Sequence, residues 1–399
     1  MKNIKREIYL QKIRPFINQP LIKVLVGQRR VGKSFLMNQL KEEVLSASKN
    51  ANIIYIDKEK YEFDEIRNYH HLVKFVKARQ ERKMNYLFID EVQEIEGFEK
   101  ALRSLLSDGI FDIYCTGSNA QMLSSDIATF LSGRQMVFKV YSLSFIEFCQ
   151  FHEIQPDKTS LNQYLKYGGL PYLIHLPKND DIIFEYLKNI YDTILFRDVV
   201  SRNEIRDVAF LNNLLHFLAD NTGSIVSAKK ISDYLKSQQS SKSVSIIINY
   251  LTFLENAYFI FKAKRKDIQG KKIFEIGEKY YFEDFGLRNS VLGFKISDIN
   301  KIVENAVYLH LLINGYKIYV GKKGDKEIDF IAERKNEKLY IQVTTSLSDE
   351  KVIKREFGNL LEVKDNYPKM VVSYDEFSGS SSYMGIKHIT LFEFLSTKI

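Results

Sequence analysis

Apolar residues form short runs over the first 140 residues, and segments with helical spacing separate these runs. A short amphipathic helix is expected at residues 6–16, and further helices follow the first two runs at 35–43 and 70–82. Strands that alternate with helices predict a parallel sheet covered by helices. We therefore expect an α/β domain at residues 1–155, with strands at 21–26, 52–57, 86–91, 110–115 and 135–140.

The pattern changes in the second part of the chain. Residues 161–207 have helical spacing that is interrupted at 168–171, which suits a small helical lid over a ligand site, assigned to 156–207. Residues 274–399 mix helical and strand patterns, which predicts a second α/β domain. Between them, residues 208–273 have the element order of a winged helix: helices at 210–219, 228–236 and 244–256, then a hairpin from 258 to 265, a turn at 267–270 and a return strand from 272.

A GxxxxGKS motif connects the first predicted strand to the first long helix. In this context the glycines let successive N–H groups surround phosphate oxygens, and the following helix points its positive end at them. Lys33 would reach the β and γ phosphates, and the Ser34 hydroxyl would bind Mg²⁺. A glycine turn without a ligand is the alternative, and the flanking strand and helix argue against it. The expected nucleotide-binding residues are Gly27, Gln28, Arg29, Arg30, Val31, Gly32, Lys33, Ser34 and Phe35.

Two carboxylates, Asp90 and Glu91, end the third apolar run. Parallel sheets bind ligands at the carboxyl ends of their strands. Asp90 would hold the Mg²⁺ shell, and Glu91 would orient and polarise an attacking water, which distinguishes a hydrolase from a nucleotide-binding switch. A solvated acidic strand end is the alternative, and the phosphate loop upstream makes it less favoured. The expected cofactors are therefore ATP and Mg²⁺.

Polar residues at 116–119 follow the fourth run. On a strand between the other two, one of them would contact the γ-phosphate or the attacking water; we favour Asn119 over Ser118, and the alternative is that the segment only caps the next helix. Arg134 precedes the fifth run. As an arginine finger, in its own subunit or a neighbouring one, it would stabilise the charge on the transferring phosphoryl group, whereas the alternative is a surface arginine. The candidate catalytic residues are Glu91, Asn119 and Arg134.

Further motifs extend the pattern along the chain. Together with the phosphate loop and 89–91, 116–119 and 131–134, they include 167–171, 196–198, 279–288 and 326–330. In order and spacing the whole set resembles the AAA+-related predicted ATPases of bacteria and archaea, in which an AAA_14-type ATPase domain precedes a DUF4143-type C-terminal region of undefined role. The resemblance implies a P-loop NTPase core of the ASCE type, with another strand between the Walker B strand and the phosphate-loop strand.

Three polar residues of the C-terminal block resemble the core of PD-(D/E)XK nucleases. They are Glu304 on a predicted helix, Asp329 on a strand and Gln342 on the next strand. In that core, carboxylates hold Mg²⁺ and a lysine two positions after the E/Q helps to activate water. Thr344 stands where this lysine belongs, and Lys354 is a candidate replacement. A degenerate, restriction-endonuclease-like domain kept as a scaffold or nucleic-acid binder is the more economical interpretation.

The charge balance leaves nucleic acid open as a partner, because 58 Lys and Arg face 50 Asp and Glu. Cations gather on the predicted wing and would contact the phosphates of double-stranded DNA. The alternative is a winged helix used as an internal spacer, because the predicted recognition helix offers Ser, Asn and Thr but few cations. The wing cations are Lys262, Lys264, Arg265, Lys266, Lys271 and Lys272.

The remaining composition excludes several classes. Cys115 and Cys149 lie in apolar surroundings without metal spacing, so neither a disulfide framework nor a zinc site is indicated. The first seven residues are charged where a signal peptide needs an apolar core, and no run reaches about 18 apolar residues. We therefore expect a soluble, cytoplasmic protein without membrane contact. Its oligomeric state is open, because an arginine finger acting in trans would require a neighbouring subunit.

These observations support a leading hypothesis and two alternatives. The first is an AAA+-like ATPase whose hydrolysis of ATP rearranges the winged-helix and nuclease-like domains on DNA. The second is an ATP-latched DNA-binding regulator without significant turnover, against which Glu91 argues. The third is an ATP-gated, metal-dependent nuclease, against which Thr344 argues.

Overall fold

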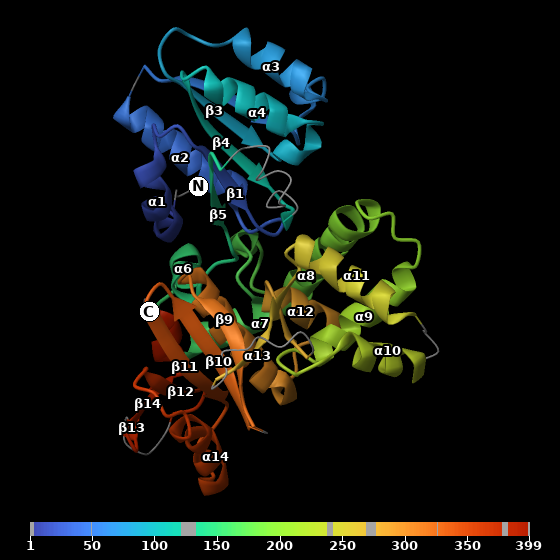
Figure 1. Ribbon diagram of the computed structural model, residues 1–399, viewed down its shortest axis with the longest axis vertical. Coiled ribbons are helices and arrows are strands. Elements are labelled where there is room, and N and C mark those ends of the chain that lie inside the picture. Colours follow the sequence, from blue (N-terminus) through green and yellow to red (C-terminus); the bar gives the residue numbers. More distant parts are fainter. Residues whose placement is uncertain are drawn as a thin grey trace. The chain divides into compact units, whose positions relative to one another are not determined.

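The structure is a computed structural model (Figure 1) that describes residues 4–48, 50–120, 133–237, 242–268, 277–324, 326–376 and 382–397. The described chain divides into two compact units: the first runs to Tyr141 and includes Asn256–Tyr258, and the second comprises Ser142–Glu255 and the chain from Phe259 onward. The first boundary is earlier than the expected residue 155. The reason is that α6 (Phe145–Phe151) contacts α7 (Lys158–Tyr167) and α15 (Leu391–Ser396) of the second unit.

The first unit contains a five-stranded parallel sheet with the order β2-β3-β4-β1-β5. Strand β4 lies between β1, which precedes the phosphate loop, and β3, which ends in Asp90. This arrangement confirms the predicted parallel α/β sheet and its strand order. The strands are β1 (Ile22–Val26), β2 (Asn52–Asp57), β3 (Asn85–Asp90), β4 (Phe111–Gly117) and β5 (Gln135–Lys139).

The helices of the first unit follow the predicted alternation with strands (Figure 1). Helix α2 begins directly after the phosphate loop. Helix α3 begins where the Asn68 side chain accepts a hydrogen bond from the His71 N–H, and it contacts α4. The bounds are α1 (Glu7–Ile13), α2 (Lys33–Ala47), α3 (Tyr69–Lys77) and α4 (Phe98–Ser107).

A lysine is buried in the middle of this sheet. All five residues of β1 are buried, including Lys23. Its Nζ forms an ion pair with Asp112 of β4, donates to the Leu21 carbonyl oxygen (2.8 Å) and lies 4.6 Å from the centroid of the Tyr114 ring. A buried charge is tolerated where it is paired and hydrogen-bonded, so this pair ties β1 to β4 without exposing either strand.

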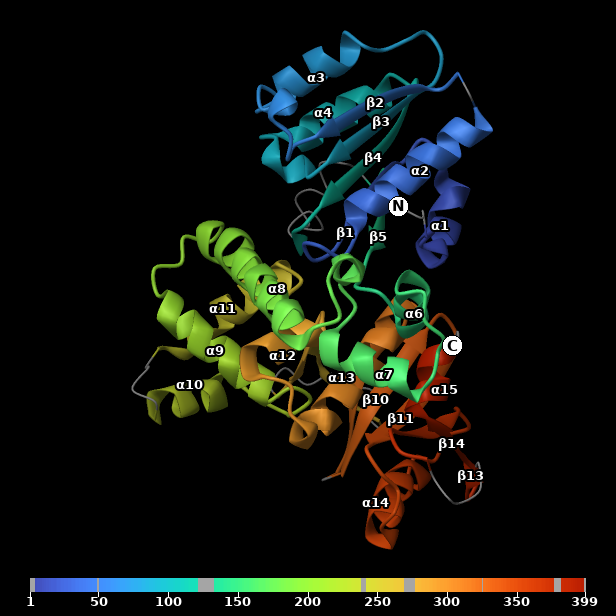
Figure 2. The same ribbon diagram turned by 180° about the vertical axis from the view of Figure 1, so that it is seen from behind.

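The first helices of the second unit are arranged around α12 (Phe285–Leu292). Helices α7, α8 (Asp180–Thr193) and α9 (Val208–Asp220) all contact α12 (Figure 2). Helix α8 continues directly into a π-helix at Ile194–Ser201. Residues 156–207, for which a helical lid was predicted, therefore pack as part of the second unit.

Three helices and a two-stranded antiparallel sheet follow, close to the predicted positions. The helices are α9, α10 (Ala228–Ser237) and α11 (Val244–Asn256), and strand β6 (Ile260–Ala263) pairs with β8 (Lys279–Phe282). An isolated bridge joins Val226, between α9 and α10, to Glu278. The segment between α9 and α10 is therefore bridged to the chain that leads into β8.

The basic segment after β6 differs from the prediction. Residues 265–267 form β7, which pairs in parallel with β9 (Lys317–Lys323), and the Val320 N–H donates to the Lys264 carbonyl oxygen (2.9 Å). The chain thus leaves the predicted hairpin and joins the C-terminal sheet. The second half of the predicted turn and the start of the return strand, with Lys271 and Lys272, lie outside the described residues.

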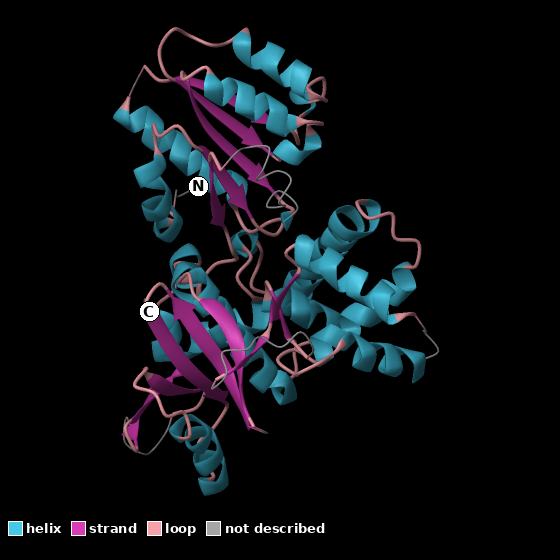
Figure 3. Ribbon diagram, in the orientation of Figure 1, coloured by secondary structure: helices cyan, strands magenta, loops and turns pink. Residues whose placement is uncertain are grey.

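The C-terminal sheet has seven strands in the order β13-β14-β12-β11-β10-β9-β7 (Figure 3). It mixes antiparallel pairs at β9, β10 and β11 with parallel pairs from β11 to β14. None of the helices in the described parts of the chain is long and apolar enough to span a membrane. The remaining elements are β10 (Lys326–Arg334), β11 (Glu337–Thr344), β12 (Lys369–Ser373), β13 (Ser382–Tyr383), β14 (Ile386–Thr390), α13 (Ile299–Ile313) and α14 (Glu350–Leu361).

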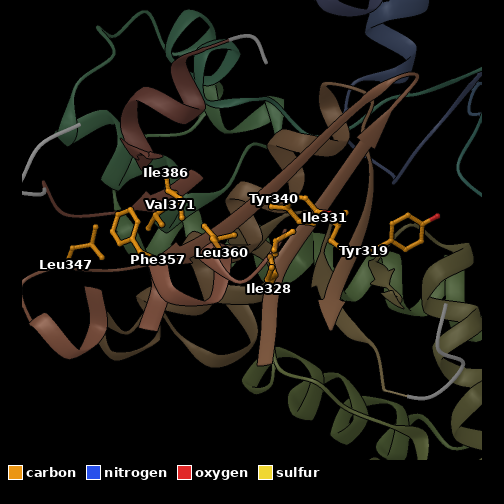
Figure 4. Packing of buried hydrophobic residues seen from close by; sticks show 10 residues of the cluster. Tyr319, Ile328, Ile331, Tyr340, Leu347, Phe357, Leu360, Val371 and Ile386 are labelled. Carbon is orange, nitrogen blue, oxygen red and sulfur yellow. The ribbon is translucent and has the colours of Figure 1, made fainter. Parts of the chain in front are cut away.

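Alternation along β10 gives this sheet two buried faces. Ile331 belongs to a hydrophobic cluster with Phe357 and Leu360 of α14 (Figure 4). The adjacent Phe330 instead lies near Tyr308 of α13, with ring centroids 6.0 Å apart. Because successive strand residues point to opposite faces, α13 and α14 cover opposite sides of the sheet.

A buried carboxylate, Asp284, joins β8 to α12 and to the turn after α7. It accepts hydrogen bonds from the N–H groups of Leu287 (3.0 Å) and Gly169 (2.7 Å). The preceding residue, Glu283, accepts one from the N–H of Ser142 (2.7 Å). Burial raises the pKa of Asp284 to about 6, although the N–H groups that it accepts from oppose this rise. Two adjacent carboxylates thus anchor both the start of the second unit and the turn after α7.

Gly168 makes this arrangement possible, and its substitution tests it. Its φ is +81°, and a Cβ atom would lie 2.2 Å from Asp284 Oδ1. We expect Gly168→Ala to lower the free energy of unfolding by at least ~2 kcal/mol, because alanine would be strained and would displace the carboxylate. Gly358→Ala in α14 is the matched control, since no atom lies within 4 Å of its added Cβ; it should raise stability by ~0.5–1 kcal/mol. Urea denaturation measures both, and equal effects would contradict the role given to Gly168.

Candidate functional site

The phosphate loop connects β1 to α2 in a conformation that requires glycine. Gly32 has a φ of +93°, in the left-handed region. At Gly27 a Cβ atom would lie 2.1 Å from the Val140 carbonyl oxygen, so only glycine fits against the chain that follows β5. The Lys33 ammonium donates to the carbonyl oxygens of Gly27 (3.0 Å) and Gln28 (2.9 Å). The loop thus curves around its own lysine, with α2 beginning at that residue.

Ser34 and Asp90, the two predicted metal ligands, lie together. The Ser34 hydroxyl hydrogen-bonds the Asp90 carboxylate, and Thr116 of β4 donates to the same carboxylate. Burial raises the pKa of Asp90, the two hydroxyl hydrogen bonds oppose the rise, and the charges of Glu91 and Asp57 add to it. A cation beside Asp90 would favour its ionised form, and a serine with one carboxylate is the donor set that Mg²⁺ shares with phosphate oxygens.

Glu91 is held in an uncommon backbone conformation at the end of β3. Its φ is +54°, and its N–H donates to the Thr116 hydroxyl (2.9 Å). The carboxylate accepts hydrogen bonds from Ser118 (3.1 Å) and Gln93. Burial would raise the pKa of Glu91, but the charges of Lys33 and Arg29 and these two hydrogen bonds outweigh it, so the pKa lies below its usual value. Glu91 is therefore a buried carboxylate that is ionised at neutral pH.

The structure brings Ser118 and Asn119 to this end of the sheet but not Arg134. Ser118 contacts Glu91 directly, and Asn119 is the next residue and is buried. The carbonyl oxygen of the exposed Arg134 accepts from the N–H of Ile22, at the opposite end of β1 from the phosphate loop. A five-residue strand spans roughly 15 Å. The Arg134 backbone therefore lies beside the end of β1 that is remote from the phosphate loop.

Two groups that the sequence analysis missed support the loop. Arg6 is fully buried, and its guanidinium donates to the carbonyl oxygens of Val31 (2.8 Å) and Tyr141 (2.9 Å). Gln93 contacts both Glu91 and Ser118. Arg6 directly precedes α1, whereas the sequence predicted it as the first residue of an amphipathic helix, where an arginine is normally exposed, so no sequence signal marked it. Gln93 could have been predicted from the sequence, because it lies two residues after a candidate catalytic glutamate.

The loop also contains a buried amide that fits a polar ligand. Gln28 is 1% exposed, and neither its Nε2 nor its Oε1 has a hydrogen-bond partner among the described residues. A buried polar group without a partner costs about 1–3 kcal/mol, so such groups are rare outside functional sites. Beside it, the buried Arg29 pairs with Glu59 after β2 (2.9 Å). The glycine turns, the lysine, the free amide and the Ser34–Asp90 pair together fit a nucleotide with Mg²⁺.

The predicted nuclease-like residues lie together in the second unit. The lysine beside them is Lys279 and not the proposed Lys354. The Asp329 N–H donates to Gln342 Oε1 (3.2 Å), and both Glu304 and Asp329 contact Lys279. The proposed replacement, Lys354, is an exposed residue paired with Glu350 on the same helix. Among the described residues, no group of three or more His, Cys, Asp or Glu side chains is arranged to hold a metal ion.

Comparison with known proteins places the chain in a family. An uncharacterized protein of Haemophilus influenzae is 36% identical over 93% of both chains. A second uncharacterized protein, from Methanocaldococcus jannaschii, is 31% identical over 89% of this chain and 82% of its own length. The chain belongs to the family of these two proteins. Its residues 19–149 match a family model described as an AAA domain. The matched range includes the phosphate loop, Asp90, Glu91 and Asn119.

The second unit and the fold add two findings. Residues 158–298 match a domain of unknown function, DUF8612, whereas the DUF4143-type region that the resemblance implied is not shown. The solved structure of a Walker-type ATPase of Pyrococcus abyssi is similar, with a TM-score of 0.52 and 14% identity, over 72% of this chain and 95% of that one. This similarity is one of fold and is consistent with the parallel α/β sheet of the first unit.

Replacement of Gln28 tests whether the unpaired amide belongs to a ligand site. We expect Gln28→Leu to raise the free energy of unfolding without nucleotide by ~1–3 kcal/mol, because it removes a buried amide that has no partner. Gln39→Leu is the matched control. Gln39 is equally buried, but its amide is bonded to Arg6 and Ile4, so its loss should destabilise the protein.

Thermal unfolding with and without ATP and Mg²⁺ measures both effects. The nucleotide should stabilise the wild type more than Gln28→Leu, because only the wild type gains a partner for the amide. Stabilisation of both proteins by the same amount would contradict this assignment.

Proposed function

We propose that this protein binds ATP with Mg²⁺ and hydrolyses it. The observation that carries the proposal is the buried, ionised Glu91 carboxylate at the end of β3. In the sheet, only β4 separates β3 from β1, the strand that precedes the phosphate loop. A nucleotide-binding switch needs the loop and the metal ligands but has no use for such a carboxylate. A hydrolase needs a group that accepts a proton from water or orients it.

Each residue has a role that follows from its contacts. Lys33 would exchange its bonds to the loop carbonyls for the β and γ phosphates, and Ser34 and Asp90 would hold Mg²⁺. When bound, Mg²⁺ neutralises charge that develops on the phosphate oxygens. Glu91 would orient the attacking water, while Ser118 and Gln93 fix the carboxylate in position. Asn119 would contact the γ-phosphate from β4, which lies between β1 and β3.

An arginine within the same subunit is available for the charge on the γ-phosphate. Arg29 is part of the phosphate loop, is 4% exposed and acts electrostatically on Glu91. Its guanidinium lies 2.9 Å from the Glu59 carboxylate. We assign the stabilising role in the same subunit to Arg29 and leave Arg134 for a neighbouring subunit, because Arg134 lies at the far end of β1.

Hydrolysis would reach the second unit through the chain after β5. The Val140 N–H bonds the Val26 carbonyl oxygen (2.7 Å), and its own carbonyl oxygen lies against Gly27. Two residues later, Ser142 is anchored on Glu283. A change in the phosphate loop on loss of the γ-phosphate would therefore act on a segment only two residues long before it reaches β8 and α12.

Two substitutions test hydrolysis. We expect Lys33→Ala to abolish nucleotide binding, and Glu91→Gln to keep ATP binding while lowering kcat by ~10²–10⁴-fold, because the amide cannot accept a proton. Glu94→Gln, at an exposed position three residues later, is the matched control and should leave kcat unchanged. Steady-state phosphate release and fluorescent ATP titration measure the two effects.

Two results would reject parts of the proposal. Full hydrolysis by Lys33→Ala would place turnover outside this site. Tight ATP binding without turnover in the wild type would favour the alternative, a regulator that uses ATP as a latch.

We also propose that the second unit contacts DNA, and its element order supports this proposal. Three helices, a bridge at Val226 and the β6–β8 pair correspond to a winged helix, with α11 as the recognition helix. The charges favour only weak contact. Lys262 and Lys266 pair with Glu255 (2.9 Å) and Glu333 (2.7 Å). The exposed apolar side chains of α11 are Val244, Ile246 and Ile248.

A salt titration measures this contact. We expect double-stranded DNA to bind in the non-specific range, a Kd of about 10⁻⁴–10⁻⁶ M, with a log–log salt slope near −2, because Lys229 and Lys230 at the start of α10 are two exposed cations of this helical segment. Lys229→Gln with Lys230→Gln should flatten the slope, whereas Lys351→Gln on α14 should not. A slope of about −5 or steeper would show that the wing cations leave their carboxylate partners and contact DNA.

A further inference from the structure

Lys279 lies at the centre of the nuclease-like cluster. Its Nζ is 2.9 Å from Glu304 Oε1, 2.7 Å from Glu327 Oε1 and 3.2 Å from Asp329 Oδ1. The side chain is 3% exposed. Burial would lower the pKa of Lys279, but the charges of the three carboxylates outweigh it and hold the pKa above its usual value. The cluster therefore surrounds a permanent ammonium.

The backbone of β10 places Asp329 in this cluster by means of a β-bulge. Ile328 pairs with Gly321 of β9, whereas Ile331 pairs with Tyr319, so two residues of β10 face one residue of β9. A bulge of this kind redirects side chains and is frequent beside functional sites. The N–H of Asp329 is taken up by Gln342 (3.2 Å), and its Oδ2 accepts from the Val343 N–H (2.9 Å). The carboxylate is thus fixed toward the centre of the cluster.

The oxygens that face the centre are already occupied. Glu304 Oε1 accepts from both Lys279 and the Tyr281 hydroxyl (2.7 Å). Both oxygens of Asp329 are engaged, one by Lys279 and one by the backbone of β11. Divalent cations need carboxylate oxygens at about 2.0–2.6 Å, and an ammonium about 3 Å from the same oxygens leaves no room for one. A divalent cation some 4 Å from the ammonium would also be repelled.

We propose that the Lys279 ammonium occupies the divalent-cation position of a nuclease-like carboxylate site, and that the C-terminal domain is a closed, non-cleaving form of that fold. Lys279 belongs to β8, which pairs with β6 beside the three helices, whereas Glu327 and Asp329 belong to the C-terminal sheet. The lysine therefore joins two sheets of the second unit through charge. The alternative is that Lys279 supplies the lysine missing at 344, so that the site binds a metal and cleaves.

Titration with Mn²⁺ of the full-length protein distinguishes these interpretations. In the wild type, no Mn²⁺ binding should depend on Asp329. Lys279→Met should gain one Mn²⁺ site whose affinity is at least tenfold higher than any that the wild type shows at this cluster. Asp329→Asn in the same variant should remove this site. Lys266→Met is the matched control, because it removes a second Lys–Glu pair of this sheet without freeing the cluster. Calorimetry measures binding, and plasmid nicking with Mn²⁺ measures cleavage.

Each other outcome counts against the proposal. Wild-type binding or nicking that Asp329→Asn abolishes would show an open metal site with Lys279 as its lysine. A folded Lys279→Met protein that gains no site would show that the cluster is not a cation position. Where Lys279→Met alone fails to fold, Mn²⁺ during refolding should restore the cooperative transition. Failure of Mn²⁺ to restore it would overturn the proposal.

Discussion

The buried Asp284 carboxylate holds separate segments of the second unit together. This side chain caps α12, holds the turn at Gly169 and occupies the space that a Cβ atom at Gly168 would need. Its neighbour Glu283 anchors Ser142, the first residue of the unit. One short acidic segment thus sets where the helices α7 and α12 lie and where the chain from β5 enters. The two motifs at 167–171 and 279–288 are therefore the two halves of a single contact.

Buried charge is handled in opposite ways at the two carboxylate clusters. At the phosphate loop, Lys33 and Arg29 lower the pKa of Glu91 but bond elsewhere, to loop carbonyls and to Glu59, so the carboxylate stays ionised and available. In the C-terminal domain, Lys279 bonds its carboxylates directly. The first arrangement is suited to a ligand that arrives and leaves, and the second to a permanent contact.

The sequence predicted the first unit well because its signals are local. The strand from 52 to 57 ends where expected, and the motif and strand order placed Lys33, Ser34, Asp90 and Glu91 at one edge of the sheet. The errors concern contacts between distant segments. Nothing in the residues 264–267 shows that they pair with β9, and the lysine of the nuclease-like cluster comes from position 279, some 50 residues before Asp329. The role of Arg134 stays a prediction, because its distance from the loop depends on its place before β5 and not on its residue type.

The left-handed backbone at Glu91 has a consequence for how this protein can change. A glutamate there costs roughly 1 kcal/mol or more relative to glycine or asparagine, which adopt that conformation readily. Random substitution screened only for heat resistance would therefore select against the side chain to which we assign the orientation of water. On that assignment, a relative with glycine or asparagine at this position would be more stable and would bind nucleotide without turnover.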